Sequence, residues 1–90
     1  MQTTHRPFAL SLIPDAPLYL VCRDFGANGF ESVSQPEMTR EGIVLDIVSG
    51  EIDRVAYVLE VFGREGTSRD ITADIADEVE RRLALRVAAE

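Results

Sequence analysis

The sequence contains no lysine and no tryptophan, and it has only one cysteine and one histidine. The single cysteine, Cys22, excludes an internal disulfide and is typical of proteins in a reducing compartment. No apolar run approaches the ~20 residues that a membrane-spanning helix needs. The first residues, 1–7, lack the apolar core of a signal peptide. We therefore expect a cytoplasmic protein without a membrane anchor.

Basic residues are scarce relative to acidic ones. Sixteen aspartates and glutamates stand against nine arginines, which gives a formal net charge of −7. A surface of this sign repels nucleic-acid phosphates, so direct nucleic-acid binding is disfavoured. The same field attracts a basic protein surface, including that of a protein which itself binds DNA or RNA.

The length of 90 residues corresponds to one domain, and 46% hydrophobic residues are enough for a globular core. Residues 1–7 are polar, and we expect them to form a flexible N-terminal tail. Residues 8–90 then make a single α+β domain. The chain shows no repeat and no linker that would divide it further.

The first half of the domain favours strands. Residues 8–13 can form a short edge strand that Pro14 ends. Residues 18–24, LYLVCRD, begin with a continuous apolar run, as a central strand requires. Residues 26–29, GANG, predict a turn, so that residues 30–34 return antiparallel as the second arm of a hairpin.

A helix, a strand and a second helix follow. The first helix can begin in residues 34–37 or with Thr39 as its N-cap, and it runs to about Ser49, where Gly50 stops it. Residues 54–62 form a strand, and residues 63–66 turn toward the last helix. Two alternating sets are expected in this strand: Val55, Tyr57, Leu59 and Val61 on one face, and Ala56, Val58 and Phe62 on the other.

These elements predict a two-layer α+β sandwich in the order (β)ββαβα. Its sheet is mainly antiparallel, and both helices cover one face. The other face is expected to carry Arg23, Glu31 and Glu60 among apolar residues. A face of this kind is expected to be partly open and to serve as an interaction surface or a dimer interface.

The last helix, beginning near Thr72, has its acids first and its arginines last. This order complements the helix macrodipole at both ends. Ile75, Val79 and Leu83 repeat every four residues and form an apolar stripe. The acidic positions that we predict to form a partner-binding site are Asp70, Asp74, Asp77, Glu78 and Glu80.

Motifs that suggest enzyme or metal chemistry fail on inspection. Residues 24–26 spell the DFG tripeptide of kinases, but the chain lacks the lysine and the catalytic loop that a kinase requires. Residues 70–74 begin like a calcium loop, but Ile75 and Arg81 stand where glycine and glutamate are needed. We predict no catalytic residue, no metal site and no cofactor. A small enzyme would need a carboxylate with a raised pKa, such as Glu60 or Asp24 turned into a pocket.

Four segments together resemble a family of small, acidic bacterial proteins of unknown function. They are the strand and turn LYLVCRDFG, the helix leading to Gly50, the strand AYVLEVF and the run SRDITADIADEVERR. The last of these is the most specific. The resemblance implies a bacterial, cytosolic, single-domain protein, and it carries no activity, cofactor or site residue.

Two functions from different classes are consistent with these observations. The first is a non-enzymatic interaction module whose acidic helix binds a basic protein surface, such as an inhibitor of a nucleic-acid-handling complex of the anti-CRISPR type carried by phages and mobile elements. The alternative is a structural or regulatory subunit that self-associates through an open sheet face. The expected state is a monomer or a homodimer, and a stable dimer favours the second function.

Overall fold

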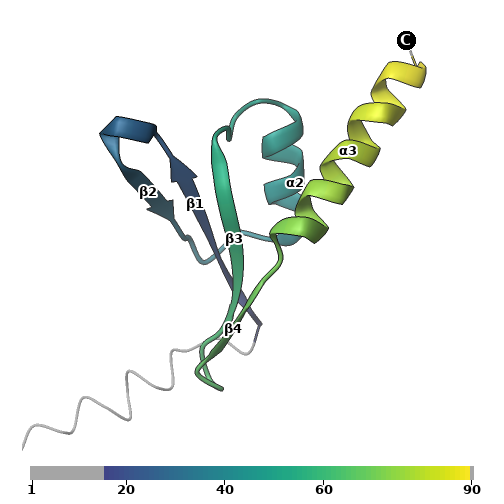
Figure 1. Ribbon diagram of the computed structural model, residues 1–90. Coiled ribbons are helices and arrows are strands. Elements are labelled where there is room, and N and C mark those ends of the chain that lie inside the picture. The colour runs from purple at the N-terminus through teal and green to yellow at the C-terminus, as the bar shows by residue number, and fades with distance from the viewer. Residues whose placement is uncertain (1–15, 90) are drawn as a thin grey trace, which may run out of the picture.

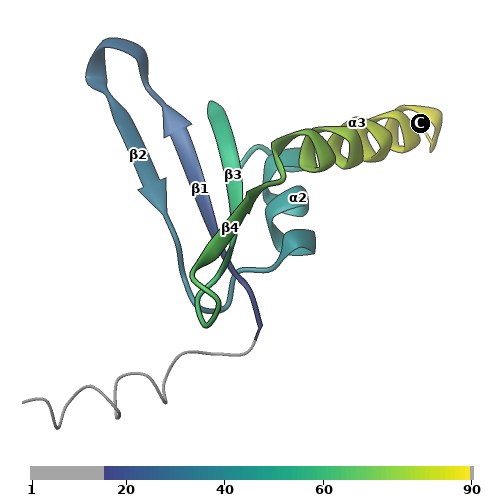
Figure 2. The ribbon, with the colours of Figure 1, turned by 60° about the horizontal axis from the view of Figure 1, so that its bottom comes forward.

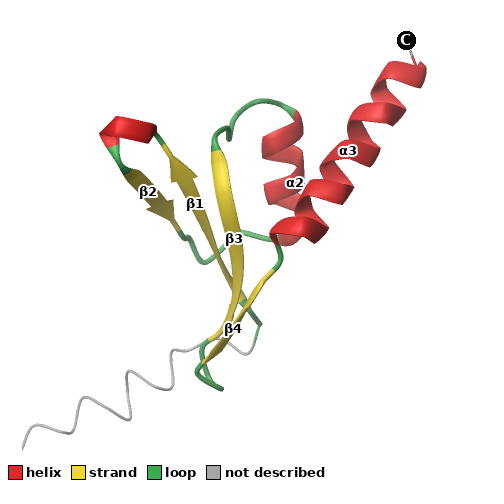
Figure 3. Ribbon diagram, in the orientation of Figure 1, coloured by secondary structure: helices red, strands yellow, loops and turns green. Residues whose placement is uncertain are grey.

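The computed structural model describes residues 16–89, which form a sheet layer and a helix layer (Figure 1). The four strands are antiparallel in the spatial order β2-β1-β3-β4. Both helices lie on the same side of this sheet (Figure 3). The elements are β1 (Leu18–Asp24), β2 (Phe30–Val33), α2 (Arg40–Val48), β3 (Val55–Phe62), β4 (Thr67–Asp70) and α3 (Thr72–Ala89), with a short 3-10 turn over Gly26–Asn28.

The predicted α+β class and the placement of both helices on one face are confirmed. The tail over residues 1–7 and the strand over residues 8–13 lie outside the described residues. The structure adds one strand, β4, in the segment between the predicted turn and the last helix. Its sequence, TSRD, is polar, all four residues are exposed, and the strand exists because it pairs with β3.

The core lies between the sheet and the helices. It is formed by Tyr19 and Val21 of β1, Val58 of β3, Ile43 and Val44 of α2, Ile75 of α3 and the connecting Ile71. These residues are brought together from five parts of the chain. Apolar burial, worth about 25 cal/mol per Å² removed from water, is the main force that holds the two layers together.

The alternation predicted for β3 holds only from Tyr57 onward. Tyr57, Leu59 and Val61 pair with residues of β1 on the side away from the helices, but Val55 packs against the core on the helix side. The register between β1 and β3 shifts at this point, so that Ala56 is an extra, exposed residue. A bulge of this kind changes the direction of the side chains that follow it.

The prediction that Arg23, Glu31 and Glu60 lie on the uncovered face of the sheet was wrong. Glu60 lies opposite Tyr19 and points to the helix side, where it is buried. Arg23 and Glu31 pair across β1 and β2, and by alternation from Val21 they lie on that same side. Arg23 is held there because it also bonds to Asp53, in the loop that follows α2. The uncovered face is therefore less charged than we expected.

Local signals place the helix ends accurately. Of the two starts considered for α2, the structure has Thr39 as the N-cap, whose hydroxyl accepts a 3.0 Å hydrogen bond from the Gly42 amide. The helix ends at Val48, and Gly50 follows with a φ of 86°, a left-handed conformation that glycine adopts without strain. Helix α3 begins at Thr72 as predicted.

The C-terminal end of helix α3 projects beyond α2 and β3 (Figures 1 and 2). The second half of the helix still contacts α2, because Arg86 donates a 3.3 Å hydrogen bond to the Val48 carbonyl. All residues from Leu83 to Ala89 are exposed.

Candidate functional site

The predicted acidic site begins at Asp70, which uses its carboxylate to start α3. Its Oδ1 accepts a 2.9 Å hydrogen bond from the Thr72 amide and a second one from the Thr72 hydroxyl. These two bonds, the hydroxyl bond first, lower the pKa of Asp70 below its ordinary value. The hydroxyl oxygen of Thr72 in turn accepts a 2.9 Å hydrogen bond from the Val58 amide of β3. Asp70 therefore anchors the helix to the sheet.

Two others of the predicted acids, Asp74 and Glu78, have counter-charges within the molecule. Asp74 lies 3.3 Å from Arg40 of α2. Glu78 pairs with Arg81 at 2.6 Å and with Arg82 at 2.9 Å.

Arg82 also reaches Glu41 of α2, at 2.9 Å. Its guanidinium therefore bridges the two helices, and the bonds to Glu41 and then Glu78 raise its pKa above the ordinary value. This network joins α2 to α3, and in it the carboxylate of Glu78 is already neutralised.

Asp77 and Glu80 are the two predicted site residues that have neither an ion pair nor a side-chain hydrogen bond among residues 16–89, and both are exposed. The other three predicted carboxylates have partners within the molecule. Within the described part of the chain, no group of three histidine, cysteine, aspartate or glutamate side chains could hold a metal ion.

The side of the sheet away from the helices forms a second candidate surface. The register places the side chains of three strands there. We call this surface the open face, and its apolar members are Leu18, Leu20 and Cys22 of β1, Phe30 of β2, and Tyr57, Leu59 and Val61 of β3. No element of the described chain covers it (Figure 3).

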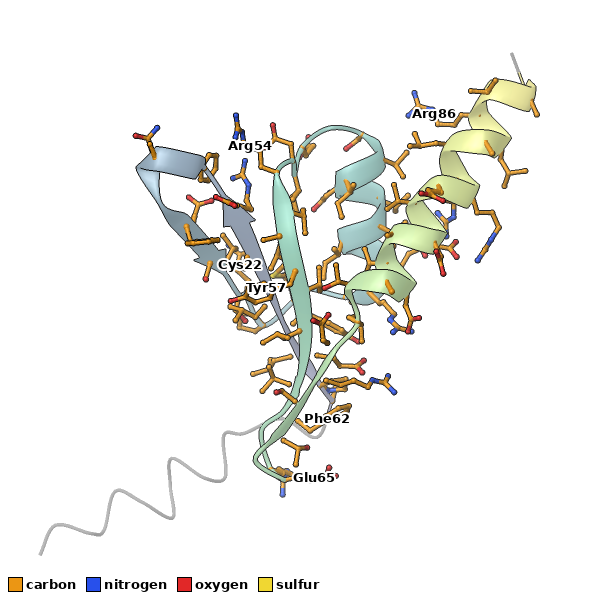
Figure 4. All side chains as sticks on the ribbon, in the orientation of Figure 1. Cys22, Arg54, Tyr57, Phe62, Glu65 and Arg86 are labelled. Atoms are coloured by element: carbon orange, nitrogen blue, oxygen red, sulfur yellow. The ribbon has the colours of Figure 1, made fainter. Side chains whose placement is uncertain are left out.

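Cys22 and Tyr57 lie directly opposite each other near the centre of the open face (Figure 4). Cys22 is buried, as expected for a cysteine within an apolar strand, although no helix covers it. The hydrogen bond between the two side chains raises the pKa of Tyr57 above its ordinary value. Tyr57 thus forms part of the cover over the thiol.

The two carboxylates considered for enzyme chemistry have structural partners. Asp24 is exposed, and its Oδ1 accepts a 2.8 Å hydrogen bond from the Gly26 amide in the hairpin turn. Glu60 is only 7% exposed, but its two oxygens accept bonds from the Tyr19 hydroxyl at 3.0 Å and from Arg69 at 2.8 Å. Glu60 is therefore a paired buried charge.

The sequence did not indicate a groove that runs beside the first half of α3. It has a volume of about 270 Å³, and its lining is mainly apolar. The lining residues are Ile47, Val55, Val58, Thr72, Ile75, Ala76, Val79 and Glu80. Val55 lines this groove only because of the bulge in β3, a feature that a regular alternation of side chains hides.

Comparison with protein-family models, curated proteins and solved structures finds no match for this chain. The resemblance to a family of small acidic bacterial proteins therefore stays a prediction. Of the helices in residues 16–89, none combines the length and the apolar character needed to cross a bilayer.

Proposed function

We propose that this protein is a non-enzymatic interaction module that self-associates by packing its open face against that of a second copy. The observation that carries this proposal is the position of both helices on one side of the sheet, which leaves Leu20, Leu59 and Val61 without a covering layer. A two-layer α+β domain with an apolar outer sheet face commonly buries that face in an interface.

The net charge of the protein favours contact between two copies at the open face over contact at other surfaces. Two molecules that each carry −7 repel one another, so the contact has to be made where charge is low. Asp24 lies at one end of β1, and Asp70 lies beside Leu59 on the edge strand β4. The residues of β1 between them, Leu18, Leu20 and Cys22, carry no charge.

The test changes two residues that lie opposite each other at the centre of the face. Leu20→Thr with Leu59→Thr keeps residues that favour strands but removes apolar surface. We expect the molar mass measured by sedimentation equilibrium to fall relative to wild type. Leu45→Gln, on the exposed side of α2, is the matched control and should leave the mass unchanged. A wild-type protein that stays monomeric at all concentrations would refute the proposal.

A second candidate function is binding to a basic protein surface, such as that of a nucleic-acid-handling complex, as an anti-CRISPR-like inhibitor. The observation that favours it is the exposure of Asp77 and Glu80 without counter-charges among the described residues. These two carboxylates are one turn apart on α3 and remain available to a partner's arginines and lysines.

This candidate is tested by an affinity pull-down from a bacterial lysate at low and high salt, because contacts between exposed charges weaken as salt rises. Asp77→Lys with Glu80→Lys should abolish capture of the partner. Glu51→Lys with Glu65→Lys makes the same change in net charge at other exposed positions and should retain it. Capture that survives in the folded Asp77/Glu80 variant eliminates this site.

A further inference from the structure

The chain contains a single asparagine, Asn28, and a glycine follows it directly. This pair lies at the tip of the β1–β2 hairpin, where Gly26–Asn28 forms the short 3-10 turn (Figure 2). Asn28 is exposed, and its side-chain amide makes no hydrogen bond within residues 16–89. The one asparagine of the chain therefore has a side chain that nothing in the described structure holds in place.

The glycine after Asn28 makes this side chain open to attack by the backbone. The Gly29 nitrogen and the side-chain carbonyl carbon of Asn28, Cγ, can close a small ring. Glycine has no Cβ to obstruct that approach, and its backbone reaches conformations that other residues avoid. A Cβ built at Gly29 would meet nothing within 4 Å, so the surroundings leave room for the ring.

We propose that Asn28 is a site of spontaneous deamidation. The Gly29 nitrogen forms a bond to Cγ of Asn28, the Cγ–Nδ2 bond breaks, and the side-chain nitrogen takes up the Gly29 amide proton and leaves as ammonia. Solvent water then opens the resulting succinimide at one of its two carbonyl carbons. The product at position 28 is an aspartate or an isoaspartate, and either adds one negative charge to the net charge of −7.

The hydrogen bonds of the turn control when this reaction can occur. The Gly29 amide donates a 3.0 Å hydrogen bond to the Gly26 carbonyl, so the attacking nitrogen is occupied while the turn is closed. The Gly26 amide in turn donates a 2.8 Å hydrogen bond to Oδ1 of Asp24. Asp24 thus holds the turn in the closed form, and deamidation proceeds from the open form.

Hydrogen bonds alone keep the tip of the hairpin closed. No residue of Gly26–Asn28 is buried, and a Cβ at Gly26 would also meet nothing within 4 Å. Exposed segments with few packing contacts open locally at a small cost in free energy. The turn therefore slows the reaction without preventing it.

The isoaspartyl product changes the end of the open face. It inserts one extra carbon into the backbone, so the Gly29 amide no longer reaches the Gly26 carbonyl in the same turn. Phe30 comes next in the chain, is 68% exposed and belongs to the open face. The isoaspartyl form should therefore self-associate less tightly than wild type. This consequence rests on the proposed contact through the open face, whereas the modification itself does not.

The first test follows the mass of the intact protein during prolonged incubation at neutral pH. Because the chain has one asparagine, a gain equal to one amide-to-acid conversion reports on Asn28, and peptide mapping separates the aspartyl and isoaspartyl forms. We expect wild type to convert and the rate to rise with pH, since the attacking nitrogen must lose its proton. Asn28→Gln is the control and should stay unconverted over the same period, because glutamine would have to close a larger ring.

The second test opens the turn. Asp24→Ala removes the acceptor of the Gly26 amide and should speed deamidation about fivefold, the change in the opening equilibrium expected for one lost hydrogen bond. Asp24→Ser keeps an oxygen acceptor without the charge and should stay near the wild-type rate. Glu65→Ala removes the same charge at an exposed position in another turn and should leave the rate unchanged.

The outcomes separate the modification from its effect on the open face. Wild type and Asp24→Ala proteins that both keep the Asn28 amide throughout overturn the proposal. Equal acceleration in Asp24→Ser and Asp24→Ala would overturn the control by the hydrogen bond, because charge would then be responsible. An isoaspartyl form that self-associates as tightly as wild type overturns only the effect on the open face. A wild type that is monomeric refutes self-association and leaves the deamidation result standing.

Discussion

Tyr19 and Glu60 face each other across the β1–β3 pair, and the Tyr19 hydroxyl donates a 3.0 Å hydrogen bond to the Glu60 carboxylate. The carboxylate is buried and would be costly without partners. Arg69 of β4 supplies the opposite charge at 2.8 Å. The edge strand that the sequence did not indicate therefore brings the cation that Glu60 needs.

Removal of the Tyr19 hydroxyl should destabilise the fold. In Tyr19→Phe the ring still fills the core, but Glu60 loses a hydrogen bond in a buried position. We expect the free energy of unfolding to fall by about 1–2 kcal/mol, measured by urea denaturation. Tyr57→Phe, on the open face, is the comparison and should have a smaller effect, since that side chain is exposed. Equal effects of the two substitutions would contradict the role given to the Tyr19–Glu60 bond.

The same residue should make stability depend on alkaline pH. Burial, followed by the hydrogen bond to Glu60, raises the pKa of Tyr19 above its ordinary value of 10.0. The folded protein therefore keeps this proton at a pH where the unfolded chain has lost it. The resulting stabilisation is complete below pH 10 and is lost as the pH rises from there through the folded pKa. The stability difference between wild type and Tyr19→Phe should shrink over that range. A difference that stays constant with pH would be inconsistent with a raised pKa.

Asp70 should have the opposite dependence, at acid pH. Its hydrogen bonds to Thr72 lower its pKa below 3.8, so the unfolded chain takes up this proton first on acidification. The stabilisation is present above pH 3.8 and is lost as the pH falls through the folded pKa. We expect Asp70→Ala to be less stable than wild type at neutral pH, with a difference that narrows below pH 3.8. Denaturation curves across this range provide the measurement, and a difference that widens on acidification would show that the carboxylate does not act in this way.

The N-cap of α2 gives a prediction that concerns local structure alone. Thr39→Ala removes the oxygen that accepts from the Gly42 amide, and such losses cost about 1 kcal/mol of unfolding free energy. Thr39→Ser retains the hydroxyl and should recover most of this loss. Thermal denaturation of the three proteins compares them directly. A serine variant as unstable as the alanine variant would mean that the methyl group, rather than the cap, is responsible.

Of the five acids predicted to form a partner-binding site, the sequence could show only that they lie in or just before one helix. Asp74 and Glu78 have the right spacing for a common acidic surface, but their counter-charges include Arg40 of α2 and Arg82, which is itself shared with Glu41. Arg40 and Asp74 are 34 residues apart in the chain. The packing of one helix on another decided which carboxylates stay available, and spacing along one helix does not contain that information.

The sequence by itself determined the elements whose signals are local: the continuous apolar strand at Leu18–Asp24, the glycine turn after it, Thr39 and Gly50 at the ends of α2, and the start of α3 at Thr72. Caps and turns act within a few residues, so a short stretch of sequence contains their cause. Only the tertiary structure decided that the polar segment Thr67–Asp70 is a strand, that Glu60 turns toward the helices, and that a bulge turns Val55 into the groove. Each of these features depends on hydrogen bonds and packing between segments that are not adjacent in the sequence. Those contacts exist only once the neighbouring strands have assembled into the sheet.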